Sequence, residues 1–219
     1  MNHTRGMQRA RTDEDKDERR RELLDAALAL FVESSFPQVK MADVAKRARL
    51  SKGTVFVYFP TKESLFLALT DRELGAWADA LHAELSEAGV SGSAQVATLV
   101  AQSLSSRKSL VRLMPLMTNI LEHNVADAQI VELKLALLER ILRVGAAFEA
   151  RLPGLAAGGG ARLVVRIYAL VVGLQVVSEL GPAAERALNA RPELALLRLD
   201  FAAELESALA DLLRGSITP

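Results

Sequence analysis

Apolar residues recur along the chain at intervals of three and four, which is the spacing of one face of an α-helix. The first such stretch covers residues 17–34 and places Leu23, Ala27, Leu30 and Phe31 on one face. Further stretches with helical spacing cover residues 62–88, 93–106, 109–123, 126–151, 162–180 and 192–214. Together with the two shorter helices described next, this pattern predicts an all-α fold.

Residues 41–59 contain two short helical stretches joined by a tight turn. Ser51 occupies the N-cap position of the second, which extends from Lys52 to Tyr58. Pro60 ends that helix because the residue before a proline is disfavoured in the α region, and Thr61 then caps the following helix. Two short helices joined in this way form a helix-turn-helix, whose second helix would enter the DNA major groove.

The run SKGTVFVYFPTKE from Ser51 to Glu63 resembles the signature of the tetracycline-repressor (TetR) family of bacterial transcriptional regulators. The likeness extends back through Val44 and Ala45 and covers roughly the first third of the chain. This resemblance implies a homodimeric all-helical protein. Its N-terminal domains would bind DNA and its C-terminal domains would hold a small ligand.

Three positions depart from the family pattern. Lys40 stands where the family usually has a threonine that caps the first helix of the motif. Arg49 replaces the usual turn glycine, so either this residue adopts a left-handed conformation or the turn differs slightly. Phe56 replaces a tyrosine whose hydroxyl typically touches a phosphate, so we expect that contact to be absent.

The predicted organisation is a flexible N-terminal arm at residues 1–16, a helix-turn-helix domain at 17–66, and a helical ligand-binding and dimerisation domain at 67–219. The arm would either reach an adjacent DNA groove or be a solvated tail. Lysines and hydroxyls would contact phosphates or base edges, and the glycine would allow close approach. The residues expected to contact DNA are Lys40, Lys52, Gly53, Thr54, Tyr58 and Lys62.

Charge separates the two predicted domains although the formal net charge of the chain is zero. Residues 1–62 hold 13 Lys and Arg against 9 Asp and Glu, whereas the remainder holds 14 against 18. A basic N-terminal part and an acidic C-terminal part are typical of a DNA-binding domain joined to a regulatory domain.

The absence of cysteine and of an apolar N-terminal signal is typical of a soluble cytoplasmic protein. The apolar run 163–177 is interrupted by Arg166 and Gln175, so we expect it to be too short to span a membrane.

The body contains a candidate site for a small, largely apolar ligand. Pro115 should kink the helix predicted at 109–123, which opens space beside it or merely serves packing. Trp77 is interpreted as a core anchor where the two domains meet, and direct contact with the ligand is the alternative. Adaptable or large side chains with a few polar handles are typical of ligand pockets, and ordinary core packing is the alternative. The predicted lining is Met114, Met117, His123, Phe148, Tyr168 and Gln175.

The last two long helices are candidates for a homodimer interface. Ala169 and Gly173 form a small-residue patch that allows close helix approach, and the helix predicted from Pro192 to Arg214 repeats leucines at seam spacing. Two such helices from each of two chains would form a four-helix core. The alternative is that both helices close the core of a single chain.

Catalysis and metal binding are poorly supported. The chain has three histidines, and His123 lies in a Glu-His-Asn triplet that is more often a helix-end cap than a metal ligand. We therefore expect no enzyme activity, cofactor or metal. The predicted function is a ligand-released repressor on a palindromic operator; the alternative is a ligand-binding or scaffolding helical protein with a vestigial DNA-binding head.

Overall fold

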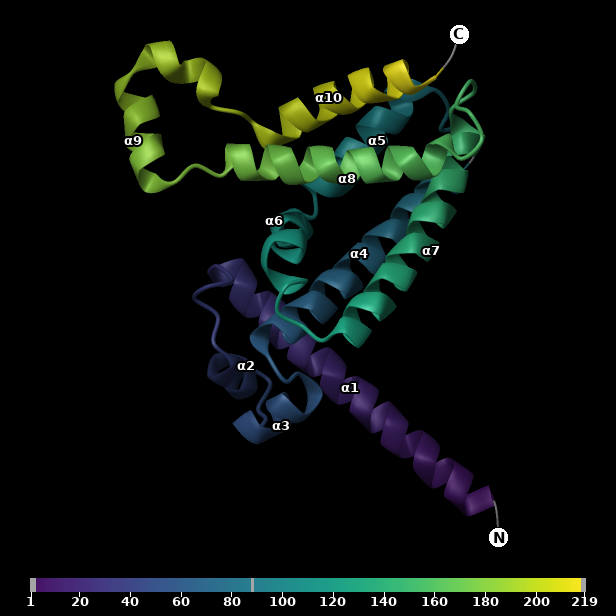
Figure 1. Ribbon diagram of the computed structural model, residues 1–219, viewed down its shortest axis with the longest axis vertical. Helices are drawn as coiled ribbons and strands as arrows, with labels where there is room; N and C mark the ends of the chain where they lie inside the picture. Colours follow the sequence, from purple (N-terminus) through teal and green to yellow (C-terminus); the bar gives the residue numbers. More distant parts are fainter. Residues whose placement is uncertain (1–2, 88, 218–219) are drawn as a thin grey trace. The chain divides into compact units, whose positions relative to one another are not determined.

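The computed structural model describes residues 3–87 and 89–217, and it describes the side chains only from residue 14 onward. The described part is helical throughout and contains no strand, so the predicted all-α fold is confirmed (Figure 1). The helices are α1 His3–Glu33, α2 Met41–Arg47, α3 Lys52–Tyr58, α4 Lys62–Ser86, α5 Ser93–Ser105, α6 Lys108–Leu116, η1 Met117–Leu121, α7 Asp127–Arg151, α8 Gly159–Ser178, α9 Pro182–Ala190, η2 Pro192–Leu197 and α10 Phe201–Ser216.

The chain divides into two compact units. Unit 1 comprises residues 1–71 and 119–125, and unit 2 comprises residues 72–118 and 126–219. Two helices pass from one unit into the other. α4 crosses after Asp71, and the π-helical turn η1 crosses after Thr118.

The core of unit 1 is organised around the buried Phe66 in the first part of α4. The rings of Phe31 and Phe36 meet the Phe66 ring edge-on, with centroids 5.7 and 4.9 Å away. Thr61 and Ser64 cap α4 reciprocally: the Ser64 amide donates to Thr61 Oγ1 at 3.0 Å and the Thr61 amide to Ser64 Oγ at 3.1 Å. This core fixes the start of α4 against the end of α1.

The two short helices of unit 1 form the predicted helix-turn-helix. Ser51 caps α3 by accepting a hydrogen bond from the Thr54 amide at 3.1 Å. Arg49 in the turn has a φ of 56°, so the left-handed conformation is the one adopted, and the Leu50 amide donates to the Ala45 carbonyl at 2.9 Å. Lys40 precedes α2 without a side-chain cap, as expected where the family usually has threonine.

The first helix is longer than predicted. α1 begins at His3 and not near Asp17, so residues 3–16, predicted as a disordered arm, continue the helix. Arginine, glutamine, alanine, glutamate and lysine have high intrinsic helix propensity, and they allow a helix without an apolar face. The absence of apolar periodicity was therefore a poor guide to disorder here.

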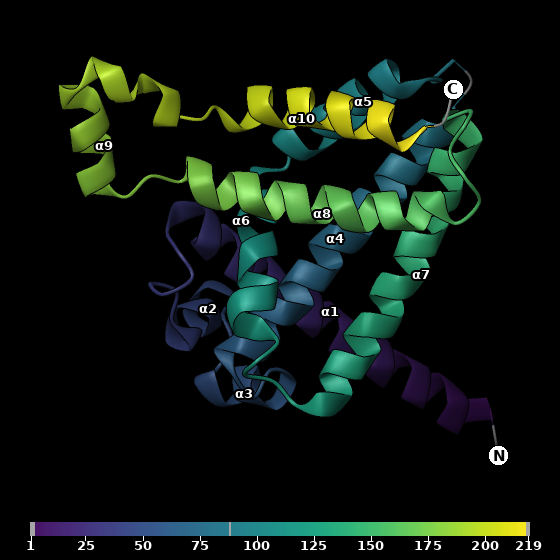
Figure 2. The same cartoon turned by 45° about the horizontal axis from the view of Figure 1, so that its top comes forward.

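Unit 2 is a bundle of helices that pack against one another in pairs. α8 and α10 run side by side, and α5 packs against α10 (Figures 1 and 2). α7 packs against α8 at a close crossing of Gly145 and Gly160. A Cβ on Gly160 would lie 2.0 Å from the Gly145 carbonyl oxygen, so only glycine permits this approach.

The end of the chain corrects one prediction. The helix predicted from Pro192 to Arg214 is interrupted: Pro192–Leu197 forms a short 3₁₀ helix, and α10 begins at Phe201. The Asp200 carboxylate caps α10 by accepting from the Ala203 amide at 2.9 Å. α9 precedes this segment and was not predicted, and it stands away from α8 and α10 in Figure 1.

α8 also differs from its prediction in length. It spans Gly159–Ser178, and Gly158 precedes it with a φ of 73°. By length and composition alone it is apolar enough to cross a membrane, so the expectation that this stretch is too short was wrong. Such a helix by itself is weak evidence of a membrane span, because core helices have the same composition, and α8 packs against α6, α7 and α10.

Candidate nucleic-acid interface and ligand cavity

α3 presents one outward face of unit 1. Val55 is fully buried and anchors the helix, while Lys52 and Gly53 are exposed and Thr54 and Tyr58 are partly exposed. Val57 is 81% exposed, which is unusual for an apolar side chain on a well-packed helix. A helix with one buried face and such an outward face can enter a DNA groove, where a methyl-bearing side chain can meet a thymine methyl.

Gly53 has no packing role within the chain. A Cβ built at this position would meet no atom closer than Ser51 Oγ at 3.8 Å. Glycine is nevertheless costly inside a helix relative to alanine. An exposed glycine that the fold itself does not require is consistent with the predicted close approach of DNA to α3.

Lys62 has a different environment from the one predicted for a phosphate contact. Its ammonium donates to the Phe36 carbonyl at 2.9 Å and lies 4.2 Å from the centroid of the Phe36 ring. Lys62 therefore ties the start of α4 to the segment between α1 and α2. Lys40, in contrast, is exposed at the start of α2.

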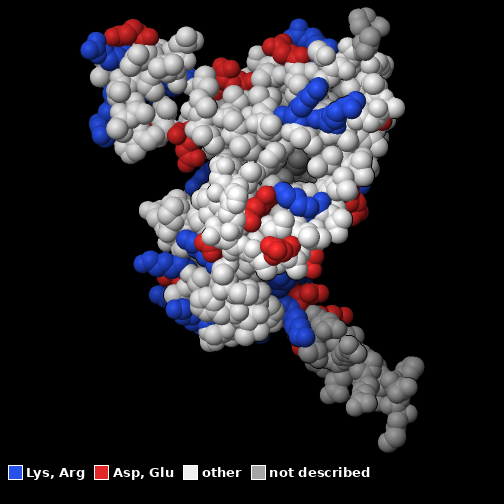
Figure 3. All heavy atoms as spheres, in the orientation of Figure 1, with Lys and Arg blue, Asp and Glu red and all other residues white. Residues whose placement is uncertain are grey.

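Cations gather on the edge of unit 1 that carries α2 and α3 (Figure 3). Arg47 at the end of α2 forms two hydrogen bonds with Glu33 at the end of α1, at 2.9 and 2.7 Å. The hydrogen bond from Arg47 holds the pKa of the Glu33 carboxyl below its ordinary value. Since this cation is paired, the exposed lysines Lys40, Lys46 and Lys52 remain as candidate phosphate contacts.

Unit 2 contains a mostly apolar cavity of about 380 Å³ that is lined by residues of α4, α6, η1, α7 and α8. Trp77 lies on its α4 wall and Tyr168 on its α8 wall, so the single tryptophan of the chain reports on this space. The full lining is Leu74, Trp77, Ala78, Met114, Met117, Thr118, Lys134, Leu137, Leu138, Arg140, Ile141, Val144, Val164, Val165 and Tyr168.

The six residues predicted to bind a ligand are only partly brought together. Met114, Met117 and Tyr168 line the cavity. Phe148 is buried in the core and does not line it, and Gln175 lines a separate cavity beside α10. His123 is exposed, belongs to unit 1 and is not among the residues that line the cavity. Phe148 was the one residue of α7 predicted to line the site, and the structure instead places Leu137, Ile141 and Val144 of that helix in the lining.

The hydroxyl of Tyr168 connects the cavity wall to the end of α6. It donates to the Met114 carbonyl at 3.1 Å and lies 2.9 Å from Thr118 Oγ1, which must then be the donor in the second bond. Pro115 lies between these two partners, and the α-helix gives way to the π-helical turn η1 directly afterwards. Pro115 lacks an amide donor, so the predicted break appears here as a change of helix type.

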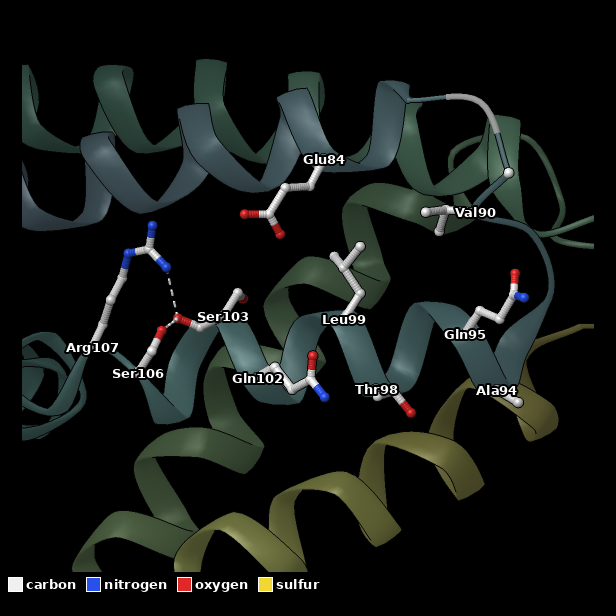
Figure 4. Close-up of a pocket in the computed structure, with 11 residues that line it drawn as sticks. Glu84, Val90, Ala94, Gln95, Thr98, Leu99, Gln102, Ser103, Ser106 and Arg107 are labelled. Atoms are coloured by element: carbon white, nitrogen blue, oxygen red, sulfur yellow. Dashed lines mark hydrogen bonds between the residues drawn. The ribbon is translucent and has the colours of Figure 1, made fainter.

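A second hollow of about 790 Å³ lies between the end of α4 and α5, and its lining is more polar (Figure 4). Arg107 donates to the Ser103 carbonyl at 2.8 Å, and Ser106 Oγ donates to the same oxygen at 3.1 Å. The Trp77 indole donates to Ser103 Oγ at 3.0 Å, so Trp77 stands between the hollow and the apolar cavity. The cavity is the better candidate ligand site because its lining is mostly apolar with a few polar groups.

Metal ligands do not cluster among the described residues: no group of three histidine, aspartate or glutamate side chains is placed to hold an ion there. Beside His123, the Asn124 amide donates to the Ile120 carbonyl at 2.7 Å, which is the helix-end capping expected of this triplet.

Transcriptional regulators of one class carry a helix-turn-helix unit and a helical unit with a cavity in the same polypeptide, and this chain has that organisation. Residues 23–69 match the family model "Bacterial regulatory proteins, tetR family", and residues 71–219 match "Tetracyclin repressor-like, C-terminal domain". The chain belongs to the tetR family of bacterial regulatory proteins, which confirms the resemblance stated from Ser51 to Glu63.

Curated relatives match only the N-terminal part. The HTH-type transcriptional repressor KstR of Rhodococcus jostii is 43% identical over 56 residues, covering 26% of this chain and 26% of that protein. The fatty acid metabolism regulator protein of Bacillus subtilis is 26% identical over 66 residues, covering 30% of this chain and 34% of that protein. The chain thus spans about a third or less of the length of these relatives.

Solved structures match most of the chain at low identity. A possible TetR family transcriptional regulator from Streptomyces coelicolor A3(2) gives a TM-score of 0.60 at 22% identity, covering 90% of this chain and 97% of that one. The regulator FadR from Bacillus subtilis, solved with stearoyl-CoA, gives 0.55 at 16% identity, with 90% and 98% covered. These likenesses establish the shared fold.

Proposed function

We propose that the protein is a homodimeric transcriptional repressor that binds a palindromic operator and leaves it when a small molecule fills the cavity of unit 2. The outward face of α3 carries this proposal, because it combines exposed cations, a glycine without a packing role and an exposed valine. Lys52, Thr54 and Val57 would read bases or adjacent phosphates, and Lys40 and Tyr58 would contact the backbone.

Dimerisation is supported by an uncovered apolar face on α8. Val165, Ala169, Gly173 and Val176 are all exposed and recur at helical spacing, so they share a face. A Cβ on Gly173 would meet no atom within 4 Å, which leaves room for the close approach of a second helix. A second copy packed here would cover this face and bring two α3 helices to one palindrome.

Control by ligand is supported by the continuity of α4. This helix begins next to α3 in unit 1, and its middle forms one wall of the cavity in unit 2. A ligand that prefers one spacing of the two DNA-binding units, by about 1–3 kcal/mol, would change operator affinity roughly 5–150-fold. The protein would act by binding and not by catalysis, in the cytoplasm where its operator lies.

The test is a titration of the full-length protein against the duplex upstream of its own gene, followed by fluorescence anisotropy. We expect a dimer that protects two symmetric half-sites, with centres about 34–36 Å apart or a larger separation that preserves the symmetry. Lys52→Ala should weaken specific binding and flatten the dependence of log K on log salt by about one unit. Lys108→Ala, an exposed lysine of unit 2, is the matched control and should leave both unchanged.

Binding that is equal for the upstream duplex and for unrelated duplexes would overturn the repressor proposal. A protein that bound a ligand in the cavity but no duplex would instead be a ligand-binding helical protein with a vestigial head, the alternative weighed from the sequence.

A further inference from the structure

Residues 179–200 form the α9–η2 extension, which joins the end of α8 to the start of α10 and stands away from both helices (Figures 1 and 2). The structure describes every residue of this extension, and none of them is buried. α9 and η2 contact each other, and neither has a comparable contact with another helix of the described chain. The Arg198 guanidinium donates to Asn189 Oδ1 at 2.7 Å. The extension is thus held together by its own hydrogen bonds and not by a core.

The side chains of the α9–η2 extension include an uncovered group of leucines. Leu196 and Leu197 are 87% and 60% exposed. Leu188, Leu194 and Leu199 are only partly buried. A single exposed leucine needs no explanation, whereas a contiguous exposed apolar group marks a contact with another macromolecule. The extension therefore has the character of an interaction surface.

α7 carries a second uncovered apolar surface, the α7 row. It consists of Val131, Leu135, Leu138 and Leu142, each of them more than half exposed. These residues recur at intervals of four, three and four, which is the spacing of a helix-packing seam. Leu138 lines the cavity of unit 2 together with Val165, which belongs to the exposed face of α8. The α7 row and the exposed face of α8 therefore adjoin each other.

A homodimer formed through the exposed face of α8 would bring the extension of one copy to the α7 row of the other. The centre of that face is the small-residue patch of Ala169 and Gly173. Antiparallel packing of two α8 helices about this patch places Ser178 of one copy opposite Val164 of the other. The extension of one copy then begins beside the first half of the second α8, which is the half that α7 crosses at Gly160.

We propose that the α9–η2 extension of each subunit packs on the α7 row of a second copy of this chain. The inference rests on the homodimer of the proposed function and adds two symmetry-related contacts outside α8. α9 has nine residues and is about 14 Å long, while the row from Leu135 to Leu142 spans about 10 Å, so the two surfaces match in length. Because Leu138 also lines the cavity, this contact lies beside the candidate ligand site.

The first test measures the dimer dissociation constant of the full-length protein by sedimentation equilibrium. Leu196→Glu combined with Leu197→Glu should raise this constant at least about tenfold, because both side chains lose apolar burial in the dimer. Both leucines are exposed within one subunit, so circular dichroism should show an unchanged fold. Val32→Glu, at an exposed apolar residue of unit 1, is the matched control and should leave the constant unchanged.

A second pair of substitutions tests the α7 row. Leu135→Glu combined with Leu142→Glu should raise the dissociation constant by a similar factor, and Leu138 is kept because it lines the cavity. Since the two pairs of substitutions remove one shared contact, all four together should weaken the dimer little more than either pair alone. Fully additive effects of the two pairs would contradict a direct contact between the extension and the α7 row.

Crosslinking identifies the contact directly, because the chain contains no cysteine and one introduced thiol can be labelled alone. Leu196→Cys, labelled with a benzophenone maleimide, is mixed with an isotope-labelled second copy and irradiated. Mass spectrometry then distinguishes crosslinks within a chain from crosslinks between chains. We expect crosslinks between chains at α7, and Val32→Cys with the same label should give none there.

The outcomes separate this inference from the proposed function. Crosslinks confined to one chain, or to parts of the second copy outside α7, would overturn the inference. If the Leu196→Glu and Leu197→Glu protein dimerises like wild type while Ala169→Glu prevents dimerisation, the dimer through α8 stands and the extension does not contact the second copy. A wild-type protein that stays monomeric at every concentration would contradict both proposals.

Discussion

The hydroxyl of Tyr168 lies 2.9 Å from Thr118 Oγ1, and Thr118 is the last residue of unit 2 before the chain passes into unit 1 through η1. The same hydroxyl donates to Met114 one turn earlier, across Pro115. Tyr168 also lines the cavity. A side chain that faces the ligand space thus holds both ends of the segment where α6 becomes a π-helix.

Tyr168→Phe should uncouple ligand binding from DNA binding. The ring and its apolar contacts remain, so ligand affinity should change by only a few fold, while the two hydrogen bonds, each worth about 1 kcal/mol, are lost. The measurement is operator affinity with and without a saturating ligand. We expect the ratio of the two affinities, set by a coupling of about 1–3 kcal/mol, to fall toward one.

Thr118→Val removes the same pair from the other side and serves as the partner in a double-mutant cycle. The two substitutions should be strongly non-additive in the coupling free energy because they break one shared interaction. Full ligand response in Tyr168→Phe would show that the signal passes elsewhere, for example through α4.

Arg49→Gly should stabilise the turn between α2 and α3. Arg49 has a φ of 56°, a conformation that costs an L-residue roughly 1–2 kcal/mol, whereas glycine adopts it freely. Glycine also loses more backbone entropy on folding, so we expect a net gain of up to about 1 kcal/mol. The free energy of unfolding from urea titration is the measurement.

Arg49→Ala is the control for loss of the side chain, because alanine retains the strained backbone. A stability gain in the alanine variant equal to that in the glycine variant would assign the effect to the guanidinium and not to the backbone.

The helix-turn-helix and the cavity of unit 2 show what the sequence could and could not predict. The helix-turn-helix was predictable because its signals are local: Ser51 as a cap, Pro60 as a stop and Val55 as a buried anchor lie within a few residues of each other. At Arg49 the sequence left two conformations open, since the choice depends on how α2 and α3 pack.

The cavity was less predictable because its wall joins distant parts of the chain. Met114 and Tyr168 were predicted, but Arg140 on a charged helix reads as a solvated cation until α4 is known to pass beside it at Gly75. The break before α10 was missed for a similar reason. Pro192 resembles a helix start, and the Asp200 cap is evident only from its bond to the Ala203 amide.

The ion pair between Glu33 and Arg47 should make the stability of unit 1 depend on pH in the acidic range. Hydrogen bonding to Arg47 lowers the pKa of Glu33 in the folded state. A lowered folded-state pKa means that the stabilisation is present above the ordinary glutamate pKa of about 4.3 and is lost as pH falls through the folded-state value. Because both side chains are exposed, salt should weaken the effect.

The measurement is the melting temperature of wild type and Glu33→Gln from neutral to acidic pH. The two should differ at neutral pH, converge at acidic pH, and differ less at high salt. Glu22→Gln, which removes an exposed pair with Arg19 within α1, is the control for a local pair that joins no two helices. A constant difference between wild type and Glu33→Gln at every pH would contradict the electrostatic explanation.

Gly53→Ala separates folding from DNA binding on α3. A Cβ at this position meets only Ser51 Oγ at 3.8 Å, so the substitution creates no clash within the chain. Alanine should also favour the helix, raising the free energy of unfolding by up to about 1 kcal/mol. If Gly53 allows DNA to approach α3 closely, the added methyl group should weaken operator binding, so stability should rise while operator affinity falls.

Gly215→Ala in α10, where a Cβ also meets nothing within 4 Å, is the control and should change operator affinity little. Operator affinity is measured by anisotropy and stability by urea unfolding on the same preparations. Unchanged affinity in Gly53→Ala would mean that DNA does not approach α3 closely at this residue, and the interface would then have to be placed on Lys52, Thr54 and Val57 without it.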